Sequence, residues 1–331
     1  MRRMADAGGI FKMTAVDQRP PIKGPIAKAH GVDEAPWEEV ARFKRLLVET
    51  LQGGSTAMLL DPHYALPVAF DVLSPTKGLI VTLEDSLFTE TAGGRTSSLI
   101  DDWSVSKIKR MGADAVKVLA WYRPDASPDV CVAQQDYVKS IGEACARADI
   151  PFLFELLVYP FPDDAHHSTG YVEMKGKKTD HVLASVEEFA KADYGVDVFK
   201  LESPVNAADA DGSAEVQAIF DDMGRLAGRP WVMLSAGAGK GDFRRILEHA
   251  FKAGASGFLA GRAIWLDAFG KYPNWEEIRA ALEADGQSYL AAIGALAAAE
   301  GLPWYDHACY NGDGARFAPA DASFRHSYPD M

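Results

Sequence analysis

The sequence has few cysteines, and their number and spacing argue against a disulfide framework. Only three occur in 331 residues, at Cys131, Cys145 and Cys309. Their spacing also matches no common metal-binding pattern. An odd number of cysteines suits a reducing compartment better than an oxidising one. We therefore expect a cytoplasmic protein.

Long hydrophobic runs are also absent. The longest weakly polar run, Leu290 to Ala299, is rich in alanine and far shorter than the roughly 20 residues that cross a bilayer. The N-terminal residues Met1–Asp6 lead into no apolar stretch of the kind found in secretory signal peptides. These absences predict a soluble protein without a membrane segment.

Positively charged residues are fewer than negatively charged ones. Lys and Arg number 34 against 47 Asp and Glu, so the formal net charge is −13. This balance disfavours non-specific binding to nucleic acid or to an anionic membrane surface. It does not disfavour a small anionic ligand, because a local cluster of basic groups can bind one. We expect a small-molecule partner.

Eight short apolar runs predict strands, and most are continuous rather than alternating, as expected for strands covered on both faces. These runs are Ile10–Gln18, Thr56–Asp61, Leu79–Glu84, Ala115–Tyr122, Phe152–Tyr159, Val198–Glu202, Trp231–Ala236 and Gly257–Ile264. Segments with apolar residues at helical spacing are Asp33–Leu51, Ala133–Ala148, Val182–Ala192, Ala214–Leu226, Phe243–Ala253 and Trp275–Ala299. Alternation of strand and helix predicts a (β/α)8 TIM barrel.

The structural alternative is a doubly wound open sheet. Its dinucleotide-binding version would require a Gly-x-Gly-x-x-Gly motif after the first strand, and the sequence has none there. No linker divides the chain, so we predict a single barrel domain over residues 1–302. Residues 303–331 are aromatic-, Pro- and Asp-rich without periodicity. We expect this tail to pack on the barrel or on a partner subunit of a homo-oligomer.

Polar residues occur at the carboxyl end of every predicted strand, and in a barrel these ends form the face that carries the chemistry. The residues at these ends are Asp17, Gln18, Arg19, Asp61, Glu84, Lys117, Glu155, Lys200, the segment Ser235, Ala236 and Gly237, and the pair Gly261 and Arg262. Three of them, Lys117, Glu155 and Lys200, stand inside apolar runs. Charged groups are rarely buried unless they are paired or used. We therefore predict one shared polar site.

Lys200 is the candidate nucleophile. An amine that is buried beside a second cation loses its proton more readily, because desolvation and like-charge repulsion both penalise the ammonium. A neutral amine can attack a carbonyl and form a Schiff base. Lys117 would be the second cation, and Glu155 would move protons during loss of water. The alternative is a buried ion pair that only stabilises the barrel.

Two glycine-containing turns follow the last two predicted strands. Barrels commonly bind phosphate at this place through backbone N–H groups and a helix N-terminus. The first turn contains Ser235 and Gly237, and the second contains Gly261 and Arg262. An arginine adds two parallel donors for an oxyanion. We predict a phosphate site here.

The histidines give no support for a metal centre. None lies inside a predicted strand, and no His-Glu-x-x-His type arrangement occurs. We predict neither a metal nor an organic cofactor. The long segment Pro160–Asp180 contains His166, His167, Lys175, Lys177 and Lys178, and its length predicts either an active-site cover or a solvated basic turn.

Several segments resemble the class I tagatose 1,6-bisphosphate aldolase family. They are Val16–Arg19, Leu59–Pro62, Gly112–Lys117, Phe154–Leu156, Gly195–Lys200 and Leu234–Gly237. Another segment, Ala253–Trp265, resembles the related sulfofructose 1-phosphate aldolases. The resemblance extends from about residue 10 to about residue 305, and its motifs occur in the same order.

The resemblance implies a metal-independent lyase that cleaves a ketose phosphate into dihydroxyacetone phosphate and an aldehyde. By position, it implies that Lys200 forms the Schiff base, Glu155 shuttles protons and Lys117 contacts the substrate near the imine. It also implies that Asp17 orients the substrate hydroxyls. Residues matching a C1-phosphate pocket are Ser235, Gly237, Gly261 and Arg262, and those near the far end of the sugar are Gln18 and Arg19.

The identity of the substrate stays open at this point. Tagatose or fructose 1,6-bisphosphate is the first expectation, and sulfofructose 1-phosphate is the second. The sequence departs from the family at Pro20-Pro21, at Glu202-Ser203-Pro204 and in the loop with His166 and His167. Alternatives outside the aldolases are a phosphate-binding isomerase or synthase that uses no Schiff base, and a non-catalytic sugar-phosphate sensor.

Overall fold

The fold is a closed barrel of parallel strands surrounded by helices, as the sequence predicts. A computed structural model describes residues 1–164, 166–168, 174, 176–314, 316 and 321–327. The strand order around the barrel is β1-β10-β9-β8-β7-β6-β3-β2. Its strands are β1 (Phe11–Ala15), β2 (Ala57–Leu60), β3 (Gly78–Thr82), β6 (Ala115–Trp121), β7 (Phe152–Leu157), β8 (Val198–Leu201), β9 (Trp231–Met233) and β10 (Gly257–Ala260).

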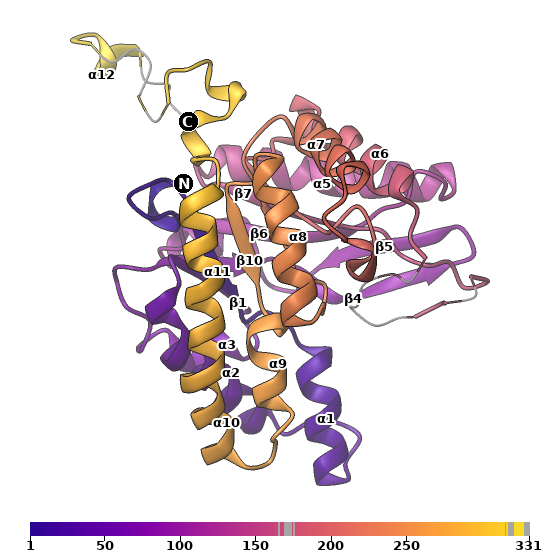
Figure 1. Cartoon of the computed structure of the whole chain (residues 1–331), viewed down its shortest axis with the longest axis vertical. Helices are drawn as coiled ribbons and strands as arrows, with labels where there is room; N and C mark the ends of the chain where they lie inside the picture. Colours follow the sequence, from indigo (N-terminus) through magenta and orange to yellow (C-terminus); the bar gives the residue numbers. More distant parts are fainter. Residues whose placement is uncertain (165, 169–173, 175, 315, 317–320, 328–331) are drawn as a thin grey trace.

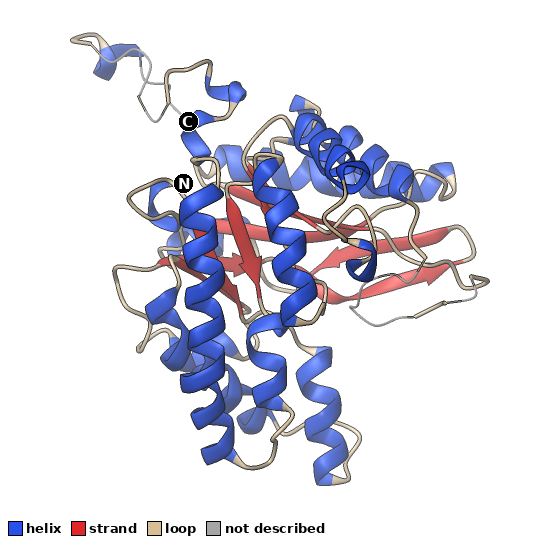
Figure 2. Cartoon of the chain, in the orientation of Figure 1, coloured by secondary structure: helices blue, strands red, loops and turns tan. Residues whose placement is uncertain are grey.

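Helices cover the outside of the strands (Figures 1 and 2). The longer ones are α1 (Pro20–His30), α2 (Trp37–Leu51), α5 (Pro128–Arg147), α6 (Thr179–Phe189), α7 (Ala214–Ala227), α8 (Lys240–Lys252), α9 (Arg262–Phe269) and α11 (Gln287–Glu300). Shorter ones are α3 (Ala65–Ala69), α4 (Val105–Arg110), α10 (Trp275–Ala281) and α12 (Phe324–Ser327). The apolar side chains of these helices and the outward-facing strand residues form the main core.

A second apolar layer fills the inside of the barrel below the predicted site. It consists of buried residues from successive strands, among them Met13, Leu59, Ile80, Leu153 and Val232. Large apolar side chains inside a barrel make it a packed core rather than a channel. The polar residues farther along the same strands therefore lie directly above a tightly packed apolar layer.

The structure differs from the sequence-based predictions in several elements. The predicted strand Gly257–Ile264 ends at Ala260, and its second half is the start of α9, because a short apolar run does not distinguish a buried strand from a buried helix. The predicted helix Trp275–Ala299 contains a π-helical turn at Leu282–Gly286. Pro20 and Pro21 begin α1, where the absent amide N–H groups cost nothing.

An antiparallel hairpin of β4 (Glu84–Thr91) and β5 (Gly94–Leu99) is inserted between β3 and β6, and it projects from one side of the barrel in Figure 1. The sequence analysis missed it, because this segment is more polar than the barrel strands. A local signal was available in the glycine pair Gly93-Gly94, which is typical of a hairpin turn.

The C-terminal segment contacts the N-terminal end of the barrel. The Trp304 side chain is buried against the inner apolar layer, and its backbone N–H donates to the carbonyl of Gly9. His307 and Ser256 share a buried hydrogen bond of 2.8 Å. Across the ranges that the structure describes, no helix has the length and apolar character needed to cross a membrane.

Candidate active site

Lys117 lies at the centre of a buried cluster of charged groups at the carboxyl end of the barrel. Its Nζ is 2.8 Å from Asp17 Oδ2, 2.5 Å from Glu84 Oε1 and 2.7 Å from Glu155 Oε2. An ammonium has three donors, and here three carboxylates from different strands surround it. The side chain of Lys117 is 2% exposed, so these interactions operate away from bulk water.

Lys200 joins the same cluster through Glu155. Strand register brings the two together, because Glu155 on β7 is the direct partner of Lys200 on β8. Lys200 Nζ lies 2.8 Å from Glu155 Oε2, the oxygen atom that Lys117 also contacts. One carboxylate oxygen therefore links two amines, and a proton has a short path between them.

The three carboxyl groups of the cluster differ in their electrostatics. Burial by itself raises the pKa of Asp17 and of Glu155, but the ammonium groups of Lys117 and Lys200 lower both, and the net shift is downward. For Glu84 burial dominates, and its pKa is raised despite the neighbouring Lys117. Asp17 and Glu155 are thus the anions of the cluster, whereas Glu84 binds a proton more readily.

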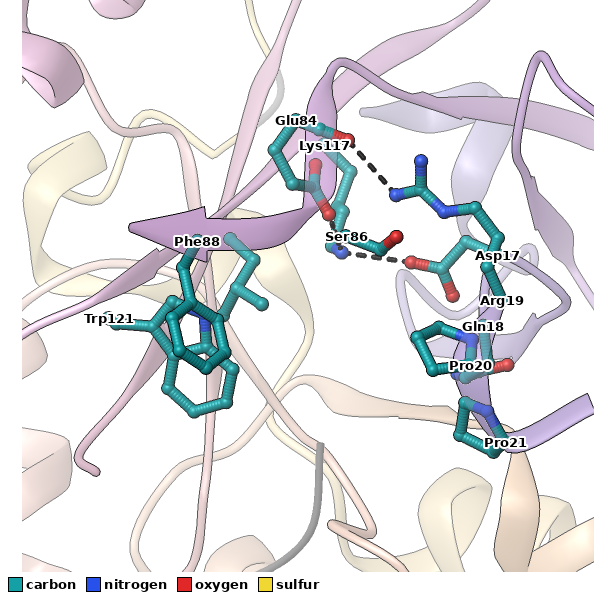
Figure 3. A pocket seen from close by; sticks show the side chains of 11 residues that line it. Asp17, Gln18, Arg19, Pro20, Pro21, Glu84, Ser86, Phe88, Lys117 and Trp121 are labelled. Carbon is teal, nitrogen blue, oxygen red and sulfur yellow. Dashed lines mark hydrogen bonds and ion pairs between the residues drawn. The ribbon is translucent and has the colours of Figure 1, made fainter. Parts of the chain in front are cut away.

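A cavity opens beside this cluster (Figure 3). Its volume is about 50 Å³, and it is partly open to solvent. It is lined by Asp17, Gln18, Arg19, Pro20, Pro21, Glu84, Ser86, Phe88, Lys117, Leu119 and Trp121. Lys200 and Glu155 are almost fully buried and do not line the cavity. The cavity therefore opens on the side of the site that holds Lys117 and Asp17.

Arg19 holds one wall of this cavity. Its Nη2 donates to the backbone carbonyl of Glu84 at 3.0 Å (Figure 3). Its Nε and Nη1 atoms are buried and have no hydrogen-bond partner within the described ranges. Unsatisfied buried donors are costly, so an anionic or carbonyl group of a ligand would be stabilised here.

The two glycine turns also meet. A Cβ placed on Gly237 would lie 3.4 Å from Cζ of Arg262, so the guanidinium packs directly over this glycine. Gly237 has a φ of +90°, and Ala236 before it also has a positive φ of 45°. A Cβ on Gly261 would lie 2.9 Å from Nε2 of Gln18. Gln18 is therefore adjacent to the predicted phosphate turns.

Asp61 has partners other than the central lysines. Its carboxylate forms a fully buried ion pair with Lys44 of α2 and accepts hydrogen bonds from the backbone N–H groups of His63 and Tyr64. The sequence analysis missed Lys44. Its position was informative, because Lys44 is one helical turn from the apolar residues Val40 and Leu47.

We predict that Lys44→Met destabilises the protein by about 3–5 kcal/mol, because it leaves the Asp61 carboxylate buried without its cation. Urea unfolding of the purified variant measures this change. The double variant Lys44→Met, Asp61→Asn should recover most of the loss. Lys191→Met, which removes an exposed ion pair with Glu188, should change stability by less than about 1 kcal/mol. Equal losses of stability in Lys44→Met and Lys191→Met would contradict the prediction.

The described part of the loop 160–180 contacts both β8 and the hairpin. Lys177 Nζ lies 3.2 Å from Glu202 Oε2 in a buried ion pair. His167 Nε2 lies 3.0 Å from Glu90 Oε2 on β4, and Arg95 Nη2 donates to the backbone carbonyl of Ser168. The loop is thus attached beside the mouth of the barrel, whereas Lys175 lies outside the described residues.

Metal-binding side chains do not cluster among the described residues. Nowhere among them do three or more His, Cys, Asp or Glu side chains form a group that could hold a metal ion. The acidic residues around Lys117 instead form ion pairs with lysine side chains.

The chain is similar in sequence to known aldolases. The family model of the DeoC/LacD family aldolases matches residues 11–267. The chain is 32% identical over 319 residues to the tagatose 1,6-diphosphate aldolase of Listeria monocytogenes, with 92% of each chain covered. It is 34% identical over 277 residues to tagatose 1,6-diphosphate aldolase 1 of Enterococcus faecalis, covering 81% of this chain and 83% of that one.

Solved structures agree on the fold. A Schiff-base-forming fructose-1,6-bisphosphate aldolase superposes with a TM-score of 0.57 at 17% identity, covering 89% of this chain and 97% of the other. At this identity the likeness concerns the barrel alone. The family model and the curated relatives carry the assignment, and they cover the strands that supply Asp17, Lys117, Glu155 and Lys200. The chain therefore belongs to the DeoC/LacD family of aldolases and is a lyase.

Proposed function

We propose that this aldolase is of class I, with Lys200 as the Schiff-base residue, and that it reversibly cleaves a ketose 1,6-bisphosphate such as tagatose 1,6-bisphosphate. The products would be dihydroxyacetone phosphate and glyceraldehyde 3-phosphate. The observation that carries the proposal is the contact of Lys200 with Glu155, whose same oxygen atom contacts Lys117. The names of the curated relatives support the substrate class.

The first stage forms the imine. The neutral amine of Lys200 attacks C2 of the open-chain ketose, and the carbinolamine then loses its hydroxyl group as water. Glu155 supports this step because it contacts Lys200 at 2.8 Å and can transfer protons to and from the reacting atoms. Lys117 keeps Glu155 in position.

The second stage breaks the C3–C4 bond. The iminium draws the bonding electrons toward nitrogen once the C4 hydroxyl group loses its proton. Glu155 accepts this proton in our proposal, because it contacts Lys200 directly, whereas Asp17 reaches the cluster only through Lys117. Asp17 has a second role, since its Oδ1 atom has no hydrogen-bond partner in the described chain and is free to hold a substrate hydroxyl group.

The phosphate on C1 would be bound by Arg262 and the turns that contain Ser235, Gly237 and Gly261. The packing of the Arg262 guanidinium over Gly237 supports this placement, because it puts a cation against the glycine turn. The distal end of the substrate would extend toward Arg19. A fixed phosphate holds C2 beside Lys200, and such positioning contributes much of the rate.

Borohydride trapping tests the proposal. Sodium borohydride added with dihydroxyacetone phosphate should inactivate the enzyme and attach a reduced three-carbon adduct to Lys200, because it reduces an imine irreversibly. Peptide mass spectrometry locates the adduct. A modification on another lysine, or turnover without any trapping, would refute the proposal and favour an isomerase or synthase. Cleavage rates of tagatose 1,6-bisphosphate, fructose 1,6-bisphosphate and sulfofructose 1-phosphate then decide the substrate.

A further inference from the structure

A continuous series of ion pairs, which ends in hydrogen bonds to Glu84, connects Lys200 to Glu84. Lys200 Nζ contacts Glu155 Oε2 at 2.8 Å, and the same oxygen contacts Lys117 Nζ at 2.7 Å. Lys117 Nζ contacts Glu84 Oε1 at 2.5 Å. The hydroxyl group of Thr82 donates to the other oxygen of Glu84 at 2.6 Å. Glu84 is thus the far end of this series.

The charges around Glu84 limit the protonation states that the cluster can adopt. The groups that face it are the Lys117 ammonium from β6 and, from the segment that follows β1, the Asp17 carboxylate and the Arg19 guanidinium. The Tyr137 phenol of α5 also interacts with it electrostatically. If every group of the cluster is ionised, its three carboxylates balance Lys117, Lys200 and Arg19. A neutral Lys200 removes one positive charge and leaves an uncompensated buried anion, which is costly.

We propose that Glu84 stores the proton that Lys200 gives up before it attacks the substrate, and that Glu84 returns this proton when the iminium forms. The inference rests on the proposed Schiff-base function. It assigns Glu84 a role that acts through Lys117 and Glu155. The cluster then keeps a constant total charge through the first stage of the reaction.

The proton balance is as follows. Lys117 gives a proton to Glu84, rotates about its Cε–Nζ bond and takes up the proton that Glu155 has received from Lys200. Lys200 becomes a neutral amine, Glu84 a carboxylic acid, and Lys117 and Glu155 are unchanged. When the C2–N bond has formed and the C2–OH bond breaks, the proton returns along the same path and leaves with the hydroxyl group as water. Lys200 is now a cationic iminium, and Glu84 is again a carboxylate.

The environment of Glu84 favours this role over Asp17 or Glu155. Burial raises the pKa of Glu84, whereas the pKa values of Asp17 and Glu155 are lowered, because the attraction of Lys117 and Lys200 outweighs their own burial. Glu84 also lacks a contact with Lys200, since Lys200 pairs with Glu155. Of the three carboxyl groups, Glu84 is therefore the one that most easily remains protonated.

Infrared difference spectroscopy tests the stored proton directly. Wild-type enzyme is compared with and without dihydroxyacetone phosphate carrying ¹³C at C2, which separates the ligand carbonyl band from those of the protein. One carboxylic acid band should disappear as the imine forms. Glu84→Gln should lack this band, whereas Glu248→Gln, which alters an exposed ion pair on α8, should retain it. A wild-type spectrum without the loss, or a loss that persists in Glu84→Gln, would overturn the inference.

The pH dependence of imine formation gives a second readout. Between about pH 7 and pH 9, imine formation in the wild type should change little, because the required proton comes from Glu84. In Glu84→Gln it must come from solvent, so the equilibrium constant should fall about tenfold per pH unit. The phosphate of the ligand is mostly dianionic in this pH range, so it adds little pH dependence of its own. An equally flat profile in Glu84→Gln would overturn the inference.

The two proposals fail differently. Absence of borohydride trapping in the wild type at every pH would reject the Schiff base itself, and the stored proton with it. Trapping at Lys200 without the infrared and pH signatures would leave the aldolase proposal intact and reject only the role of Glu84. Glutamine has nearly the shape of a protonated glutamic acid, so the variant preserves the packing around Thr82 and Lys117.

Discussion

Lys200→Met is expected to lower kcat by roughly 10⁵–10⁶-fold, the scale seen when a covalent nucleophile is removed from other enzymes. Methionine has a similar length but no amine, so no imine can form. The fold should persist, because Glu155 keeps its contact of 2.7 Å with Lys117 after Lys200 is lost. The loss should appear with every ketose phosphate substrate.

Steady-state kinetics and urea unfolding of the same preparation distinguish lost chemistry from lost structure. Lys191→Met serves as the matched control, because it makes the same substitution at an exposed site. We expect wild-type activity from this control. Residual activity above about 1% in Lys200→Met, with a folded protein, would mean that Lys200 is not the nucleophile.

Arg262→Ala is expected to weaken the binding of the C1-phosphate by roughly 2–5 kcal/mol, because the guanidinium is 6% exposed and its charge pair with the phosphate would be desolvated. The residue also packs against Gly237 at the start of the adjacent turn. The principal change should be a higher KM for phosphorylated substrates. Isothermal calorimetry with dihydroxyacetone phosphate measures the same loss at equilibrium.

A substrate without phosphate provides the control for Arg262. In the condensation direction, the rate with unphosphorylated dihydroxyacetone should be similar in the wild type and in Arg262→Ala, because no phosphate is present to be bound. A second control, Arg244→Ala, removes an arginine of α8 that pairs with Glu248 at the surface. If Arg262→Ala impairs both substrates equally, the residue stabilises the fold rather than the phosphate.

Much of the barrel was predictable because parallel strands and their helices leave strong local patterns. Continuous apolar runs identified β6, β7 and β8. The errors occurred where an apolar run continues from strand into helix, as at Gly261, or where a polar hairpin is inserted, as at β4 and β5. These elements owe their structure to tertiary packing more than to their own periodicity.

The candidate site was predictable in part for a related reason. Lys117, Glu155 and Lys200 were conspicuous because each interrupts an apolar strand. Lys44 was not recognised, although it lies among apolar helix positions, because lysines on amphipathic helices usually face solvent.

The sequence by itself determined which barrel strands exist and which of them carry a charged group in an apolar setting. That information is local, since it depends on residue type and on a period of two or 3.6 residues. Only the tertiary structure decided which groups meet: Lys117 with three carboxylates, Asp61 with Lys44, and Arg262 with Gly237. The physical reason is that barrel closure and strand register place residues about 100 positions apart within hydrogen-bonding distance, as with Asp17 and Lys117.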